Sequence, residues 1–212
     1  MTGVEIDDYE RENLVQQQAE HDTFTVERYR QLARYLPPAT AVVLDVGCST
    51  GRGGLEIARL RPRAELWGLD VVQHRLDALP TVYVNRVRGL STEIPLEDGA
   101  VDVVVAGEFL EHLRARDVDP TLCEFQRVLR VGGRLLLTTP NPNSLRLRMF
   151  NMSVYGPGHL TQHHAGVLRQ RIRMHGFKHV HITGTGKMSR YLGTHVPVLP
   201  LYGSYLVRGD KC

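Results

Sequence analysis

The stretch Val42-Val43-Leu44-Asp45-Val46-Gly47-Cys48-Ser49-Thr50-Gly51 decides the fold that we expect for this chain. Its first five residues are apolar except for Asp45, which is typical of a parallel strand buried between two layers of helices. Gly47 and Gly51 then interrupt the run, and glycine lets a ligand approach main-chain N–H groups without a Cβ in the way. Residues 55–60 follow with helical spacing. The stretch therefore predicts a strand, a tight loop and a helix N-terminus that form one ligand-binding corner.

The glycines of this loop do not fit the dinucleotide fingerprint. They are spaced G-x-x-x-G rather than G-x-G-x-x-G, and the loop lacks the lysine of a P-loop. A second apolar run, residues 66–70, ends in the carboxylate of Asp70, and an acid in this place accepts hydrogen bonds from ribose hydroxyls. An adenosine ligand without a pyrophosphate therefore fits the two motifs better than NAD does.

Four pieces of the sequence together resemble the class I S-adenosylmethionine-dependent methyltransferases of the small-molecule type. They are the motif 44–51, the strand-end Asp70, the run 94–104, and the element 108–113 that leads to 132–137. The resemblance begins near Thr40 and reaches the C-terminus. It implies an α/β, Rossmann-like fold with a mixed seven-stranded sheet, helices on both faces and an antiparallel C-terminal edge hairpin.

The resemblance also implies how the chain is divided. We expect a single methyltransferase domain over residues 1–212, which consists of an N-terminal helical cap (1–39), a cofactor-binding core (40–140), a substrate lid and helix (141–175) and a C-terminal hairpin (176–212). The segment 184–200 is long for a hairpin loop, so we expect it to carry a helix. That segment forms either part of the substrate pocket or the contact of a homodimer.

The cofactor that the resemblance implies is S-adenosyl-L-methionine. The family commonly presents an acidic residue to the adenine amino group at the position where this chain has Leu90. We therefore expect the main-chain groups of Leu90 and Ser91, or the Ser91 hydroxyl, to bind adenine. The complete set of expected cofactor contacts is Asp45, Gly47, Cys48, Ser49, Gly51, Asp70, Val71, Leu90, Ser91 and Gly107.

Glu108, Glu111 and His112 follow the buried run 101–106, and their spacing predicts that they share one face of a helix. Oxygen and nitrogen ligands so arranged can hold a divalent ion such as Mg²⁺ or Mn²⁺. The pattern E-x-x-E-H resembles the metal site of ubiquinone-pathway O-methyltransferases and of small-RNA 2′-O-methyltransferases. A later histidine completes the set there, and His159 is the residue that matches it. The expected metal ligands are thus Glu108, Glu111, His112 and His159.

The same residues have an alternative interpretation that stays open. A Glu-His pair at this point can pack under the sheet edge or orient a loop without any metal. In that case His112, His159 or His163 serves as the general base, because imidazole is the side chain best suited to move a proton near neutral pH.

Composition restricts the class of partner. A chain of 212 residues with 42% hydrophobic content can bury one large core, and its net charge of +3 is weak for a dedicated nucleic-acid binder. The three cysteines show no C-x-x-C spacing, and no apolar run is long enough to span a membrane. We therefore expect a cytoplasmic protein whose partner is a small molecule, with neither a nucleic-acid nor a membrane partner.

The predicted function is O-methylation of a small molecule such as a sugar or natural-product hydroxyl, with metal assistance as an open question. Two alternatives remain at this point. The E-x-x-E-H element with His159 also fits an RNA 2′-O-methyltransferase, and the cofactor motifs alone also fit a non-catalytic cofactor-binding partner subunit.

Overall fold

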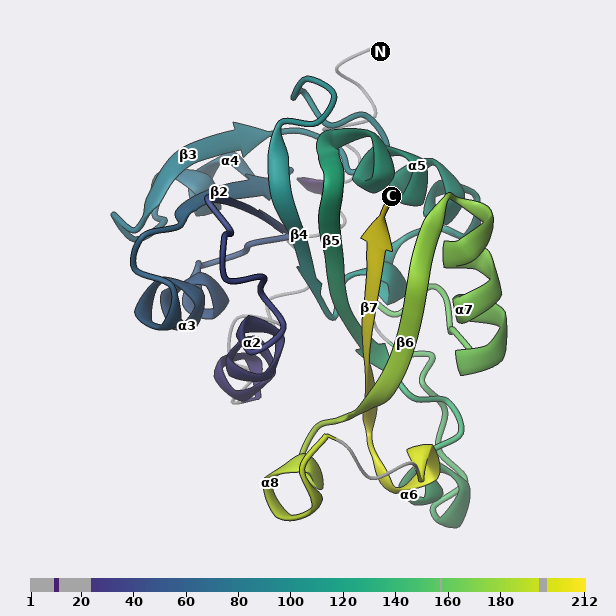
Figure 1. The fold of residues 1–212 in the computed structure, drawn as a ribbon. Coiled ribbons are helices and arrows are strands. Elements are labelled where there is room, and N and C mark those ends of the chain that lie inside the picture. The colour runs from purple at the N-terminus through teal and green to yellow at the C-terminus, as the bar shows by residue number, and fades with distance from the viewer. Residues whose placement is uncertain (1–9, 12–23, 157, 195–197) are drawn as a thin grey trace.

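A computed structural model describes residues 10–11, 24–156, 158–194 and 198–212 of the chain. Its centre is a seven-stranded sheet with the order β3-β2-β1-β4-β5-β7-β6 (Figure 1). The strands are β1 (Val42–Val46), β2 (Glu65–Asp70), β3 (Tyr83–Arg88), β4 (Val101–Gly107), β5 (Leu129–Pro140), β6 (Phe177–Thr185) and β7 (Ser204–Lys211). Strands β1 to β5 are parallel, whereas β7 runs antiparallel between β5 and β6. The predicted mixed sheet with an antiparallel C-terminal hairpin is confirmed.

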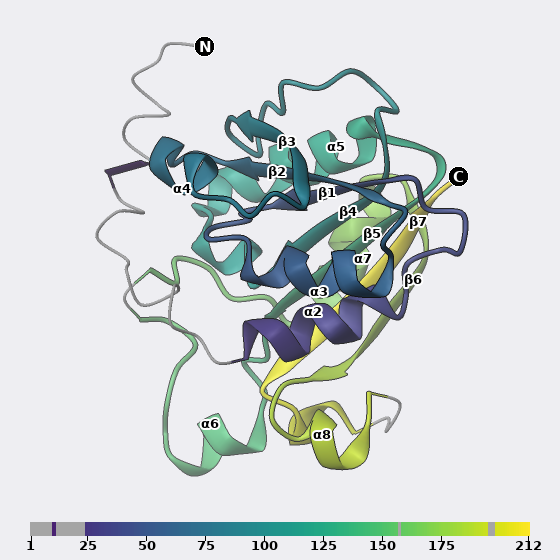
Figure 2. The same cartoon turned by 90° about the vertical axis from the view of Figure 1, so that its left-hand side faces the viewer.

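Helices cover both faces of the sheet, as predicted (Figures 1 and 2). Helices α2 (Thr25–Ala33), α3 (Arg52–Leu60) and α4 (Gln73–Asp77) pack on one face, and α5 (Val118–Val128) and α7 (Ala165–Met174) pack on the other. Shorter pieces are α6 (Leu145–Met149), α8 (Ser189–Leu192) and the 3₁₀ turns η2 (Leu110–His112), η3 (Ala115–Asp117) and η4 (Leu199–Leu201). The helix expected between residues 184 and 200 is therefore present as α8.

Alternation along the central strands explains the two layers. In β1, Leu44 and Val46 contribute to the core cluster that contains Phe125 of α5, whereas Val43 contributes to the cluster that contains Ile57 of α3. Successive side chains of a strand point to opposite faces, so a strand covered on both sides must be apolar in both phases. This is why the run 42–46 is almost continuously apolar.

The N-terminal cap is described only in part. Within the described part of the expected cap (1–39), the main helix is α2, which lies across the sheet against α3 (Figure 2). Residues 1–9 and 12–23 of the expected cap lie outside the described residues. Within the described ranges, no helix has the length and the apolar character that crossing a lipid bilayer requires.

Candidate active site

The loop after β1 is held in an unusual backbone conformation. Gly47, Ser49 and Gly51 have φ values of 68°, 48° and 75°, which lie in the left-handed region that costs little for glycine. The main-chain N–H groups of Gly47 and Cys48 both donate to the Leu69 carbonyl oxygen, at 2.8 and 3.2 Å. The loop is thereby tied to the end of β2, and Gly51 becomes the residue that precedes α3.

Asp70 sits at the end of β2 and faces this loop. Its Oδ2 accepts a hydrogen bond from the Ser49 N–H at 2.9 Å, and its Oδ1 accepts one from the Val72 N–H at 3.0 Å. Burial raises the pKa of Asp70, while these two N–H groups favour the charged form. Ser49 Oγ is buried nearby with no hydrogen-bond partner among the described residues. A fixed carboxylate and an unpaired hydroxyl therefore border the place where an adenosine ligand is expected.

Asp45, an expected cofactor contact, is surrounded by groups of the protein itself. Its carboxylate is fully buried and accepts hydrogen bonds from the hydroxyls of Tyr29, at 2.7 Å, and Tyr83, at 2.5 Å. Burial raises the pKa of Asp45 to about 6, against the opposing effect of the two hydroxyls. Asp45 of β1 thus joins α2 and β3 to the strand that leads into the cofactor loop. Helical spacing alone does not predict the contact between the Tyr29 hydroxyl and Asp45.

The structure shows which polar groups near the expected adenine site are already bonded within the protein. Ser91 is buried, and its hydroxyl lies 2.8 Å from the Thr121 hydroxyl. The Val71 carbonyl accepts a hydrogen bond from Arg88 Nε at 3.2 Å. Since the Ser91 hydroxyl is already bonded to another side chain, we favour the main-chain groups of Leu90 and Ser91 as the adenine contacts.

Three other residues that were expected to contact the cofactor, Gly47, Cys48 and Gly107, are closely packed. Cys48 is buried, and burial raises the pKa of its thiol, so that the thiol stays uncharged. A Cβ on Gly107 would lie 2.5 Å from the Tyr29 ring, and a Cβ on Gly47 would lie 2.6 Å from the Phe109 ring. Glycine is therefore required at both places by the rings that pack there.

We expect Gly47→Ala to lower the free energy of unfolding by about 2 kcal/mol, because an L-residue is strained at φ 68° and its Cβ collides with Phe109. Chemical denaturation measures the change. The matched control is Gly166→Ala in α7, where a Cβ meets nothing within 4 Å. Equal unfolding free energies for the two variants would contradict this account of the loop.

The prediction that Glu108, Glu111 and His112 share one face of a helix after β4 is wrong. Glu108 precedes the 3₁₀ turn η2 and has a φ of 51°, so it does not share an α-helical face with Glu111 and His112. Its main-chain N–H donates to the carbonyl oxygen and to the hydroxyl of Thr138, both at 3.0 Å, which turns the chain sharply. The Glu108 carboxylate lies 3.5 Å from Arg28 Nε of α2. Glu108 therefore pairs with α2, and it is not part of the group of ligand atoms that the other three expected metal ligands form.

Three of the four expected metal ligands come together in the structure, namely Glu111, His112 and His159. One ligand atom of each lies within 4.8 Å of the others. Glu111 is fully buried, its Oε2 accepts a hydrogen bond from the Thr139 hydroxyl at 3.0 Å, and its Oε1 has no partner among the described residues. Burial, with a further effect of Glu108, raises the pKa of Glu111 well above its usual range. We call these three residues the triad.

Hydrogen bonds fix how the two imidazoles of the triad are oriented. His112 Nδ1 lies 2.7 Å from the Gly158 carbonyl oxygen, and His159 Nδ1 lies 2.9 Å from the Val154 carbonyl oxygen. A carbonyl oxygen can only accept, so each Nδ1 carries the proton and each neutral ring has its lone pair on Nε2. The rings are edge to face, with centroids 5.0 Å apart. The triad thus offers two imidazole lone pairs and one carboxylate oxygen.

The segment that carries His159 is attached to η2 by its backbone. The N–H groups of Leu160 and Thr161 both donate to the Glu111 carbonyl oxygen, at 2.7 and 3.1 Å. His163, the third expected base, is buried, and its Nε2 lies 3.1 Å from the Thr161 hydroxyl. His163 therefore contacts the attached segment through Thr161, and His163 is not part of the triad.

Stability should depend on pH through His112. Burial, with a smaller effect of His159, lowers the pKa of His112 to about 4. In the unfolded chain the pKa of His112 is near 6.5, so as the pH falls the unfolded chain binds the proton before the folded protein does. The contribution of His112 to stability is therefore complete above about pH 6.5 and is lost as the pH falls toward 4. We expect the wild type to lose about 3 kcal/mol more unfolding free energy than His112→Gln over this interval. Urea denaturation at several pH values measures the difference, and parallel curves would contradict it.

Comparison with known proteins agrees with this geometry. Residues 44–137 match the family described as "Methyltransferase domain". The chain is 32% identical over 138 residues to a malonyl-[acyl-carrier protein] O-methyltransferase of Laribacter hongkongensis, covering 58% of this chain and 46% of that protein. It is 40% identical over 103 residues to a probable S-adenosylmethionine-dependent methyltransferase of Mycolicibacterium smegmatis, covering 47% and 38%. The matched regions thus span less than half the length of these two relatives.

Solved structures share the fold. A SAM-dependent methyltransferase from Archaeoglobus fulgidus superposes with a TM-score of 0.70 at 21% identity, covering 94% of this chain and 99% of that one. The sheet order, with parallel strands β1 to β5 and the antiparallel β7, defines the class of protein as Rossmann-like α/β. Residues 44–137 belong to the methyltransferase domain family, and the chain has the fold of the class I S-adenosylmethionine-dependent methyltransferases.

Proposed function

We propose that this protein transfers the methyl group of S-adenosyl-L-methionine to an oxygen of a small molecule, within one methyltransferase domain. The observation that carries the proposal is the position of the triad, which follows β4 at the same sheet edge as the cofactor loop and Asp70. In open α/β sheets, ligands bind outside the carboxyl ends of the strands. A methyl donor held by the loop would therefore face the two imidazoles.

The reaction needs positioning more than it needs strong acid–base catalysis. The sulfonium is a reactive donor, and holding the acceptor oxygen, methyl carbon and sulfur in line can lower the barrier by about 7 to 11 kcal/mol. The acceptor hydroxyl must also lose its proton. We assign this task to the Nε2 atom of His159, whose Nδ1 is held by the Val154 carbonyl oxygen, because burial lowers the pKa of His112 to about 4 and makes His112 a poor base near neutral pH.

The triad also fits a bound divalent ion. Glu111 Oε1 is a buried oxygen without a hydrogen-bond partner among the described residues, and one ligand atom of each triad residue lies within 4.8 Å of the others. Carbonyl oxygens hold the Nδ1–H groups of both imidazoles, as is usual for metal-binding histidines. Two nitrogens and one carboxylate suit Mn²⁺ better than Mg²⁺, which prefers oxygen ligands. Such an ion, when bound, would lower the pKa of a coordinated hydroxyl.

The test of the proposed function is release of S-adenosylhomocysteine from S-adenosylmethionine across a panel of acceptors. The panel contains sugars, vicinal diols, simple amines and a malonyl thioester, the last because malonyl-[acyl-carrier protein] O-methyltransferases are among the relatives. We expect turnover with at least one oxygen acceptor and an O-methyl product by mass spectrometry. Methylation of the amines alone would contradict the proposed acceptor atom.

We expect metal-stripped protein to bind Mn²⁺ in calorimetry, and Glu111→Gln or His159→Ala to weaken this binding by at least about 100-fold, since even second-shell changes cost roughly 10 to 100-fold. Glu108→Gln should retain binding, because Glu108 pairs with Arg28 outside the triad. Affinity should rise with pH, because Glu111, whose pKa is raised, must lose its proton. Loss of binding in Glu108→Gln, or none in wild type, would contradict the triad as the site.

A further inference from the structure

A polar groove between α2 and α8 shares no lining residue with the candidate active site. It has a volume of about 490 Å³, and its walls include Arg30 and Arg34 from α2 and Arg190 from α8. We call it the arginine groove. Residues 30 and 34 lie one helical turn apart, whereas Tyr29 and Leu32 of the same helix are buried against the sheet. The groove is therefore on the outer side of the helix that reaches the cofactor loop with Tyr29.

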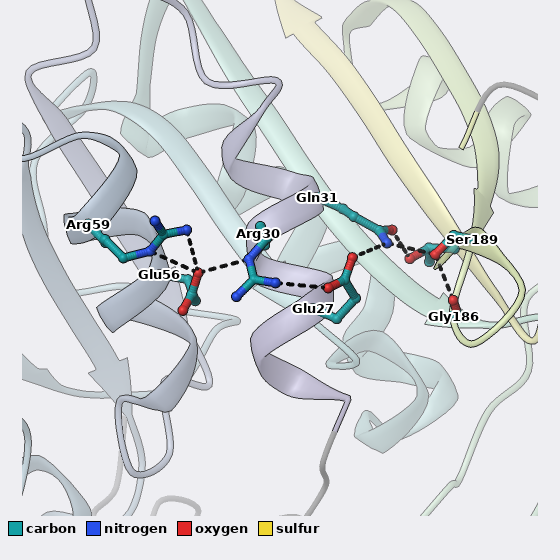
Figure 3. Close-up of polar contacts among 8 residues, drawn as sticks. Glu27, Arg30, Gln31, Glu56, Arg59, Gly186 and Ser189 are labelled. Carbon is teal, nitrogen blue, oxygen red and sulfur yellow. Dashed lines mark hydrogen bonds and ion pairs between the residues drawn. The ribbon is translucent and has the colours of Figure 1, made fainter. Parts of the chain in front are cut away.

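A network of hydrogen bonds holds the two walls at a fixed separation (Figure 3). The buried amide of Gln31 donates from Nε2 to the Ser189 hydroxyl at 2.6 Å and to Glu27 Oε1 at 3.0 Å, and its Oε1 accepts from the Thr185 hydroxyl at 2.5 Å. The Ser189 hydroxyl in turn donates to the Gly186 carbonyl oxygen at 2.6 Å. A satisfied buried network of this kind makes the groove rigid before any ligand arrives.

The charge of the groove is unbalanced. Arg30 is neutralised by Glu27 and Glu56, each at 3.2 Å, and Glu56 also binds Arg59 (Figure 3). Arg34 and Arg190 pair with no carboxylate in the part of the chain that the structure describes, and the Arg190 guanidinium lies over the Phe24 ring at 4.9 Å. Three guanidinium groups thus border the groove against the single carboxylate of Glu27.

We propose that the arginine groove binds the phosphate group of a small organic phosphomonoester. A guanidinium presents two parallel N–H donors that match the oxygens of a phosphate, and the groove is lined by Arg34 of the α2 C-cap and by Arg190 of α8. The cavity of about 490 Å³ is larger than a phosphate ion needs, so it also has room for the organic part of the ligand. Arg30, which is already paired with two carboxylates, forms part of the wall of the groove together with Arg34 and Arg190.

Calorimetry at fixed ionic strength with ribose 5-phosphate tests the proposal, with ribose as the uncharged probe. We expect the wild type to bind ribose 5-phosphate and not ribose, and the double variant Arg34→Met, Arg190→Met to bind at least about tenfold more weakly. Both side chains are exposed, so the fold should persist, which circular dichroism checks. The matched control is Arg63→Met, an exposed arginine outside the groove, which should bind as the wild type does.

Three results would overturn the proposal. They are equal binding of ribose and ribose 5-phosphate to the wild type, unchanged affinity in the double variant, and an equal loss of affinity in Arg63→Met. The last result would show attraction to the overall positive charge of the protein rather than a site. The single variants Arg34→Met and Arg190→Met should each lose part of the affinity, because each wall contributes one guanidinium that no carboxylate of the described residues neutralises.

Discussion

Asp70→Ala should weaken the binding of S-adenosylhomocysteine by about 100-fold in calorimetry. The Asp70 carboxylate is fixed by the Ser49 and Val72 N–H groups, so its remaining lone pairs are oriented before a ribose arrives. Two charge-assisted hydrogen bonds to ribose hydroxyls contribute roughly 1.5 to 3 kcal/mol each, and about 3 kcal/mol corresponds to a factor of about 100 in affinity. The loss should appear in affinity with unchanged stoichiometry.

Two further variants keep this prediction testable if the alanine substitution also disturbs the loop. Asp70→Asn retains one acceptor oxygen without the charge, and it should lose less affinity than Asp70→Ala. Asp77→Ala is the matched control, because Asp77 is exposed at the end of α4 and bonds only Gln73 among the side chains of the described residues. An affinity for Asp70→Ala within a factor of three of that of Asp77→Ala would place the adenosine elsewhere.

His159→Ala should lower the turnover number on the best acceptor of the panel by roughly 10² to 10⁴-fold, the usual contribution of a positioned proton acceptor. The affinity for S-adenosylhomocysteine should stay within about twofold of wild type, because in the proposed mechanism His159 acts on the acceptor and not on the cofactor. Steady-state kinetics and calorimetry on the same preparation separate the two effects.

The control for this variant is His181→Ala on the edge strand β6, where the imidazole is exposed. A fall in turnover for His159→Ala no larger than that for His181→Ala would remove His159 from the site. Equal losses of turnover and cofactor affinity in His159→Ala would instead indicate that the residue supports the fold of the loop.

The sheet could be predicted from the sequence because its signals are local. Apolar runs such as 42–46 and 101–106 identify central strands, and a strand-end carboxylate such as Asp70 identifies the ligand edge without any knowledge of tertiary contacts. The approach of His159 to Glu111 and His112 is not local. It followed from a resemblance to known metal sites, and the structure brings the three residues together.

The rest depended on contacts that spacing does not encode. The spacing of Glu108, Glu111 and His112 fits an α-helix, but the chain makes a 3₁₀ turn because the Glu108 N–H is bound by Thr138 of the neighbouring strand. Tyr29 has the spacing of any buried helix residue, and only the folded structure shows its hydroxyl on Asp45. In both cases a partner far away in sequence decides the role of the residue.

The central claim is that a methyl donor bound by the loop after β1 faces the triad of Glu111, His112 and His159. A crystal structure with S-adenosylhomocysteine and Mn²⁺, using anomalous scattering from manganese and sulfur, tests it most directly. The account predicts ribose hydroxyls on Asp70, a manganese peak coordinated by all three triad residues, and the cofactor sulfur facing that peak. A nucleoside bound away from Asp70, or manganese bound without Glu111 and His159, would contradict it.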